Sequence, residues 1–145
     1  MQISSRFTIA MHIFACIDTF EEEYKITSDF LASSICVNPV IIRKILSQLK
    51  KAGLIDVARG SGGASIKKPL NEITFYDIYM AVDSVEKGEL FHFHEKPNVN
   101  CPVGKNIHLI MDEKLAEIQK AMEDKMREYT IADLKKDLEV CFKEK

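Results

Sequence analysis

The side chains whose types and spacing most clearly indicate a binding function are basic, and they lie between residues 35 and 68 of a 145-residue chain. In this stretch Asp56 is the single carboxylate, against seven positively charged side chains: Arg43, Lys44, Lys50, Lys51, Arg59, Lys67 and Lys68. The chain as a whole has a formal net charge of −2, so this positive charge is local. Arginine and lysine grouped in this way bind the phosphates of double-stranded DNA. The alternative interpretation is a solvated basic face on a small helical domain.

A predicted helix positions most of these basic residues. Asn38 is a suitable N-cap, and Pro39 follows at the first helical position, where its missing N–H costs nothing. Gly53 is a typical residue to end the helix. Apolar residues recur between these signals at helical spacing: Val40, Ile41, Ile42, Ile45, Leu46 and Leu49. Basic and polar residues occupy much of the rest, which predicts an apolar face and a basic face on one helix.

Two short β-prone runs follow this helix, at residues 54–57 and 64–66. A flexible tip rich in glycine joins them and carries one arginine, Arg59. A shorter helix beginning at Thr27 precedes the basic helix. Together these elements predict a mainly α fold that contains a helix-turn-helix followed by a two-stranded wing. The N-cap, the helix stop and the Arg-Gly wing favour DNA binding over a solvated basic face.

Each part of this motif has an expected contact. Recognition helices place their N-terminal residues in the major groove, and here these are Asn38, Pro39, Val40, Arg43 and Lys44. Arg59 suits the narrow, electronegative minor groove. Gly60 and Ser61 are expected to bond phosphates from the wing, and Lys50 to add electrostatic attraction.

The stretches ASSICVNPVIIRKILSQLKKAGLI and RGSGGAS resemble the DNA-binding region of the Rrf-two family of bacterial transcription regulators. That family includes the iron–sulfur cluster regulator, the nitric-oxide-sensitive repressor and the cysteine-metabolism repressor. SSRFTIAMHIFACI, TFYDIYMAVD and CPVG are similar to further family motifs. Each motif is weak alone, but their order and spacing over roughly residues 3–128 are specific. The resemblance implies a sequence-specific DNA-binding transcription regulator, with repression the commoner mode of action.

Three parts of the chain are expected: a winged helix-turn-helix domain at 1–83, a sensing or linker loop at 84–102, and dimerisation and C-terminal helices at 103–145. Apolar residues at steps of three and four form a stripe on the long helix, and the family resemblance implies that this stripe is the interface of a homodimer: Ile107, Met111, Leu115, Ile118 and Met122. A helix of about 26 residues spans about 39 Å. Two recognition helices set roughly 34–36 Å apart would read a palindromic operator.

The cysteines depart from the pattern of the cluster-binding relatives. Those relatives carry three closely spaced cysteines in the loop before the long helix, whereas Cys101 is the only one here. Iron–sulfur sites need several thiolates, so we expect no cofactor and no metal site. His92 and His94 could supplement Cys101, but a histidine pair flanked by phenylalanines is more typical of packing and surface.

A thiol switch is the remaining chemical hypothesis. Cys36 precedes the basic helix, and a thiol near a helix N-terminus and positive charge has a lowered pKa and higher reactivity. In a dimer, Cys101 of one subunit could form a disulfide with Cys36 of the other and alter DNA binding. One alternative is that both are small structural residues. Others are that Phe91, Phe93 and the Met-rich helix bind an unknown small-molecule effector, or that a regulator of this fold responds to a metal or an iron–sulfur cluster.

Other classes of protein fit less well. No apolar run approaches 18 residues, which argues against a membrane span. No secretory signal precedes the first helix, and the cysteines lack paired spacing, so a cytoplasmic protein is expected. No phosphate loop, nucleophile elbow, HExxH or dinucleotide motif indicates an enzyme. A winged-helix module that binds only proteins stays an alternative, although the basic excess argues against it.

Overall fold

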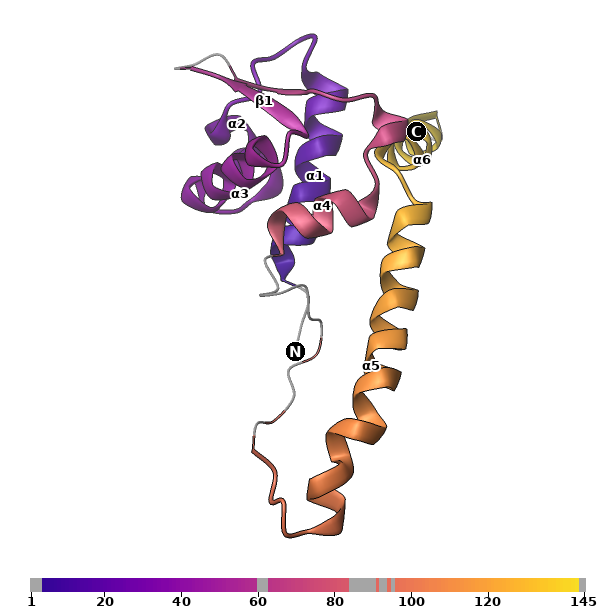
Figure 1. Ribbon diagram of the computed structural model, residues 1–145. Helices are drawn as coiled ribbons and strands as arrows, with labels where there is room; N and C mark the ends of the chain where they lie inside the picture. The colour runs from indigo at the N-terminus through magenta and orange to yellow at the C-terminus, as the bar shows by residue number, and fades with distance from the viewer. Residues whose placement is uncertain (1–3, 60–62, 84–90, 92–93, 95, 144–145) are drawn as a thin grey trace.

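The computed structural model describes residues 4–59, 63–83, 91, 94 and 96–143, and its fold is mainly helical (Figure 1). The elements in chain order are α1 (Ser5–Phe20), α2 (Ser28–Ile35), α3 (Pro39–Lys51), β1 (Ile55–Ala58), β2 (Gly63–Ile66), η1 (Leu70–Glu72), α4 (Phe75–Val82), α5 (Pro102–Glu128) and α6 (Ile131–Lys143). Helices α2 and α3 with the β1–β2 hairpin form a winged helix-turn-helix, and the long α5 follows. The expected fold class is confirmed.

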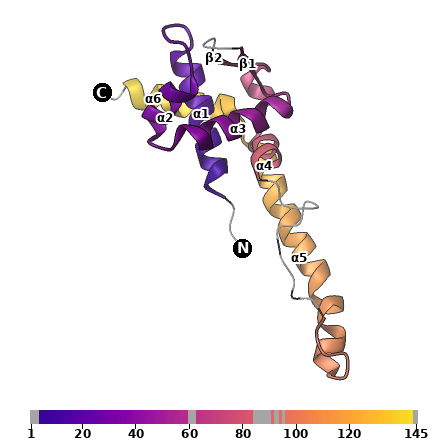
Figure 2. The same cartoon turned by 90° about the vertical axis from the view of Figure 1, so that its left-hand side faces the viewer.

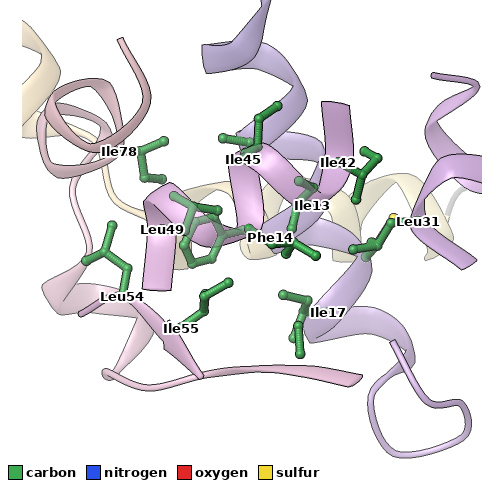
Figure 3. Close-up of a cluster of buried hydrophobic side chains, with 14 of the residues drawn as sticks. Ile13, Phe14, Ile17, Leu31, Ile42, Ile45, Leu49, Leu54, Ile55 and Ile78 are labelled. Atoms are coloured by element: carbon green, nitrogen blue, oxygen red, sulfur yellow. The ribbon is translucent and has the colours of Figure 1, made fainter. Parts of the chain in front are cut away.

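Helix α1 is the centre of the hydrophobic core (Figure 3). Its residues Ile13, Phe14 and Ile17 are fully buried. Side chains from α2, α3, α4 and the wing pack around them: Leu31, Ile42, Ile45, Leu49, Leu54, Ile55 and Ile78. Burying an aliphatic or aromatic side chain of this size stabilises a fold by roughly 1.5–3 kcal/mol. The core therefore fixes the orientation of α3, whose buried residues all lie on one face.

The ends of α3 follow the local sequence signals. The Asn38 side chain accepts a hydrogen bond from the backbone N–H of Val40 at 2.8 Å, and Pro39 is the first helical residue. At the other end Gly53 has a positive φ of 78°, and the N–H of Leu54 bonds the carbonyl of Leu49 at 3.1 Å. This arrangement is the usual glycine-terminated helix end. The predicted start and stop of the recognition helix are confirmed.

The wing is attached to the segment between α1 and α2. Strands β1 and β2 pair antiparallel, with Ile55 opposite Ile66. The N–H of Ala64 donates to the carbonyl of Ile26 at 2.8 Å. Gly63 has a φ of 83°, and a Cβ at this position would lie 2.8 Å from the backbone nitrogen of Ile26. Glycine is therefore required at position 63 for the close approach of the two backbones.

Helix α5 extends away from the rest of the molecule (Figures 1 and 2). Its C-terminal end is attached to the start of α4. Thr74 and Thr130 form an isolated antiparallel bridge, and the N–H of Phe75 bonds the carbonyl of Tyr129 at 2.9 Å. The guanidinium of Arg127 lies 3.9 Å from the centre of the Tyr76 ring, a cation–π contact. None of the 27 residues of α5 is buried.

Among the described residues no single helix is long and apolar enough to cross a membrane. Helices α2 and α3, bent by 115° with respect to one another, meet those criteria of length and composition only when they are taken together.

Candidate nucleic-acid interface

The outward face of α3 is the side opposite to its buried residues. Four exposed residues spaced by four, three and four positions form this face: Val40, Lys44, Ser47 and Lys51. Residues at these intervals share one side of a helix. Val40, in the first turn, has an exposed fraction of 61%. The face thus combines one apolar side chain with hydrogen-bonding and cationic groups.

Arg43 and Lys50 lie on a different side of α3 from Lys44. With Ser47 they line a groove of about 360 Å³ between α3, the start of α2 and the wing. The first turn of α2 also borders the groove, where the Thr27 hydroxyl accepts from the N–H of Phe30 at 3.1 Å. A helix N-terminus and two cations favour an anion such as phosphate. The structure thereby distinguishes Arg43 from Lys44, which the sequence had treated alike.

The surface at the base of the wing carries charges of both signs. A second hollow of about 730 Å³ is lined by two cationic residues, Lys25 and Lys50, and by three acidic ones, Glu21, Glu22 and Asp56. Asp56 also pairs with Lys67 at 3.9 Å, and both side chains are exposed. Exposed pairs of this kind contribute little to stability, but this one offsets a positive charge that the sequence counted as part of the patch.

The remaining predicted DNA contacts lie at the helix start and the wing tip. The Asn38 oxygen caps α3, and the NH₂ of the same exposed side chain is a hydrogen-bond donor. Pro39 is half-buried, and Arg59 is exposed directly after β1. Gly60 and Ser61 lie outside the described residues, as do His92 and Phe93.

Cys36 and Cys101 occupy opposite kinds of helix end. Cys36 is the C-cap of α2, with a positive φ of 63°, and its thiol lies 3.6 Å from the carbonyl oxygen of Ser33. Cys101 is the exposed N-cap of α5. The backbone N–H groups of Gly104 and Val103, in the first turn of α5, hold the pKa of the Cys101 thiol below its ordinary value.

One chain does not bring these two thiols together. Cys101 caps the N-terminal end of α5, and in both views this is the end of α5 that lies farther from α2 (Figures 1 and 2). A disulfide needs Cα atoms within about 7 Å. The expected Cys36–Cys101 pairing therefore requires a second subunit, and it stays a prediction.

The predicted dimer stripe on α5 is partly covered by its own chain. Ile118 has an exposed fraction of 53%, whereas the other four members are half-buried: Ile107, Met111, Leu115 and Met122. Sequence analysis missed three exposed aliphatic residues of α5: Leu109 at 79%, which lies on another side of the helix, and Val103 at 65% and Ile110 at 51%. Val103 and Ile110 are seven positions apart, which places them on the same side of the helix as Ile107 and Ile118. That spacing was readable from the sequence.

Comparisons with known proteins agree with this geometry. A family model described as Rrf2, iron-dependent transcriptional regulator, matches residues 3–137. YwnA of Bacillus subtilis (strain 168), named as an HTH-type transcriptional regulator, is 39% identical over 132 residues, which are 91% of this chain and 96% of YwnA.

Two solved structures share the fold. A crystal structure described as that of a DNA binding protein has 34% identity and a TM-score of 0.71, and it covers 90% of this chain and 98% of that one. A structure described as a transcriptional regulator from Lactobacillus plantarum has 26% identity and a TM-score of 0.76, and it covers 93% and 90% of the two chains. With its family model, its relatives and its winged helix in agreement, this chain belongs to the Rrf2 family of transcriptional regulators.

Proposed function

We propose that the protein is a cytoplasmic, homodimeric repressor that binds a palindromic operator in double-stranded DNA. The observation that carries this proposal is the exposed face of α3. It presents Val40, Lys44 and Ser47 outward, beside the groove that holds Arg43 and Lys50. A helix that the core holds in place and that exposes such a face fits the major groove, because its exposed side chains can contact base edges and phosphates at the same time.

The expected contacts divide between bases and backbone. Lys44 and the Asn38 amide reach base edges, while Arg43 and Lys50 neutralise a phosphate at the start of α2. Arg59 enters the neighbouring minor groove, where the potential is most negative when the groove is narrow. Gly60 and Ser61 bond phosphates from the wing tip. Most of the affinity then comes from charge, and the specificity comes from the outward face of α3.

The dimer is supported by the exposed aliphatic residues of α5. Val103, Ile110 and Ile118 would remain in water in a single chain, and their burial against a second α5 is favourable. A helix of 27 residues is about 40 Å long. Paired α5 helices are thus long enough to hold two recognition helices one turn of DNA apart.

The iron in the family description does not fit the described residues of this chain. Within the part of the chain that the structure describes, no three histidine, cysteine or acidic side chains gather as metal ligands. Cys16 is buried in the core, and Cys36 and Cys101 lie on different elements. Iron–sulfur clusters need several thiolates at one place, so we assign no step to iron here.

The signal is instead assigned to the thiols. In the proposed switch, a peroxide accepts two electrons from the Cys101 thiolate and Cys36 of the partner subunit. The O–O bond of the peroxide breaks and one S–S bond forms, and the two oxygens leave as two waters from hydrogen peroxide or as water and an alcohol from an organic hydroperoxide. The bond would pull on Cys36, at the turn two residues before the N-cap of α3, and so lower DNA affinity. The exposure and lowered pKa of Cys101 support its role as the attacking group.

Selection of binding sites from a random pool of duplexes, with fully reduced protein, tests the proposed function. We expect a palindromic motif whose half-sites are about one helical turn apart. Arg59→Ala should then weaken binding and lower the salt slope by about one unit. Lys136→Ala removes a matched charge from an exposed position on α6 and should change neither quantity. A pool without any enriched motif would refute sequence-specific binding.

The switch is tested on the selected operator. Peroxide should lower the affinity of the wild type and produce a disulfide-linked dimer on a non-reducing gel. Cys36→Ser and Cys101→Ser should each abolish both effects. A loss of affinity that persists in both variants would rule out the thiol switch and leave the DNA-binding function intact.

A further inference from the structure

We infer that Val40 reads the 5-methyl group of a thymine in each half-site of the operator. The inference rests on the proposed function and adds the base that the recognition helix selects. It begins from an exposed apolar side chain in a basic surface. Val40 is 61% exposed at the second position of α3, although its side chain has neither the charge nor the hydrogen-bond donor that would bind phosphate.

The orientation of Val40 follows from the packing of α3. The core holds the opposite side of the helix through four residues: Ile42, Ile45, Leu46 and Leu49. Val40 is four residues before Lys44 and seven before Ser47, so these side chains share the outward face. The Asn38 cap bonds the N–H of Val40 itself at 2.8 Å, which fixes the first turn. Val40 is therefore directed away from the core on a rigid helix.

The chemistry of valine selects one feature of the major groove. Its side chain has no hydrogen-bond donor or acceptor, so it cannot pair with the polar edges of guanine, adenine or cytosine. The 5-methyl group of thymine is the apolar group that unmodified bases present there. Lys44 on this face, with Arg43 and Lys50 on another side of α3, draws the helix against DNA, and contact with a methyl group then removes apolar surface of Val40 from water.

Ile41 is the natural comparison, because it is also aliphatic and 43% exposed. The next residue of a helix is rotated by about 100°. Ile41 therefore lies to one side of the line formed by Val40, Lys44 and Ser47. The geometry assigns the methyl contact to Val40 and not to Ile41.

The experiment measures affinity for the selected operator with each thymine replaced in turn by uracil, which removes the methyl group alone. Burial of one methyl group is worth about 0.8 kcal/mol, or roughly a fourfold change in affinity. We expect a loss of that size at one thymine per half-site under the start of α3. In Val40→Ala the same replacement should change affinity by less than half as much, which the double-mutant comparison isolates. Ile41→Ala should keep the full loss.

Three results would overturn the inference while sequence-specific binding stands. The first is an operator in which uracil is harmless at every thymine. The second is a uracil effect of unchanged size in Val40→Ala. The third is a uracil effect that disappears in Ile41→Ala but stays in Val40→Ala. A pool with no enriched motif would instead refute the proposed function, and this inference with it. Val40 is exposed and alanine is a strong helix former, so the variant keeps the fold.

Discussion

Replacement of Gly63 by alanine tests how the wing is attached to the helical core. Gly63 has a φ of 83°, and an added Cβ would lie 2.8 Å from the nitrogen and 3.1 Å from the oxygen of Ile26. Both neighbouring atoms belong to the backbone, so a side-chain rotation cannot relieve the contact. The hydrogen bond from Ala64 to Ile26 must lengthen or break. Gly53 provides a matched control, because its φ is 78° and its Cβ would meet nothing within 4 Å.

The two substitutions share one cost and differ in another. A left-handed conformation costs an L-residue roughly 1–2 kcal/mol, and alanine regains about 0.4–1 kcal/mol through the unfolded chain. Gly53→Ala should therefore destabilise by about 1 kcal/mol. Gly63→Ala adds an overpacking cost of about 1–3 kcal/mol and the loss of a hydrogen bond worth about 1 kcal/mol. We expect an excess of roughly 2–4 kcal/mol over the control, unless the wing detaches locally at a smaller cost.

Urea unfolding gives the free energy of unfolding of both variants, and binding to the selected operator reports on the wing. If the wing stays attached, the free energy of unfolding of Gly63→Ala falls well below that of Gly53→Ala. If the wing detaches, stability is kept but the contribution of Arg59 to the salt slope disappears. Equal stability of the two variants together with unchanged DNA binding would refute the attachment of β2 to Ile26.

Three further predictions concern helix ends and titrating groups. In the capping box of α4, the Thr74 hydroxyl accepts from the N–H of Asp77 and the Asp77 carboxylate accepts from the N–H of Thr74, both at 3.0 Å. Thr74→Ala removes this box and should cost about 1 kcal/mol, which lowers Tm by about 2–4 °C. A thermal melt in which Tm changes by less than about 1 °C, or about a quarter kcal/mol, would argue against this cap. Burial raises the pKa of Asp83 above 3.8, so wild-type stability falls as pH rises from that value through the raised pKa. Asp83→Asn removes the titrating group, so its Tm advantage over the wild type should grow over the same interval and then level off. Thermal melts in a pH series would contradict this if the advantage were largest in acid. The lowered pKa of Cys101 predicts that its alkylation rate, followed by mass spectrometry against pH, has a midpoint below 9.0, and a midpoint at or above that value would exclude an activated thiol.

Much of the DNA-binding motif was predictable because its signals are local. Asn38, Pro39 and Gly53 fix the ends of α3 through backbone geometry that involves only a few neighbouring residues. The spacing of apolar residues along α3 is also a local property, because it decides which face of the helix is buried whichever elements form the core. Thr74 predicted the start of α4 in the same way, and the structure adds the reciprocal hydrogen bond, in which the Asp77 carboxylate accepts from the backbone N–H of Thr74.

The predictions that involved distance in space were less complete. Arg43 and Lys44 are adjacent in the chain and equally basic, yet one lines the groove at α2 and the other points outward. The apolar stripe of α5 was visible, but half-burial of Met111 and Met122 by the same chain was not. The reason is that each of these properties depends on which other element lies beside the helix.

The sequence by itself determined the elements, the location of the positive charge and the family resemblance, because these depend on residue type and spacing along the chain. Only the tertiary structure decided which groups meet. It separated Cys36 from Cys101 within one chain, joined Gly63 to Ile26, and left Val40 exposed on the outward face of α3. Contacts of this kind arise from packing between segments distant in sequence, where the core and the backbone hydrogen bonds, and not local propensity, fix the positions.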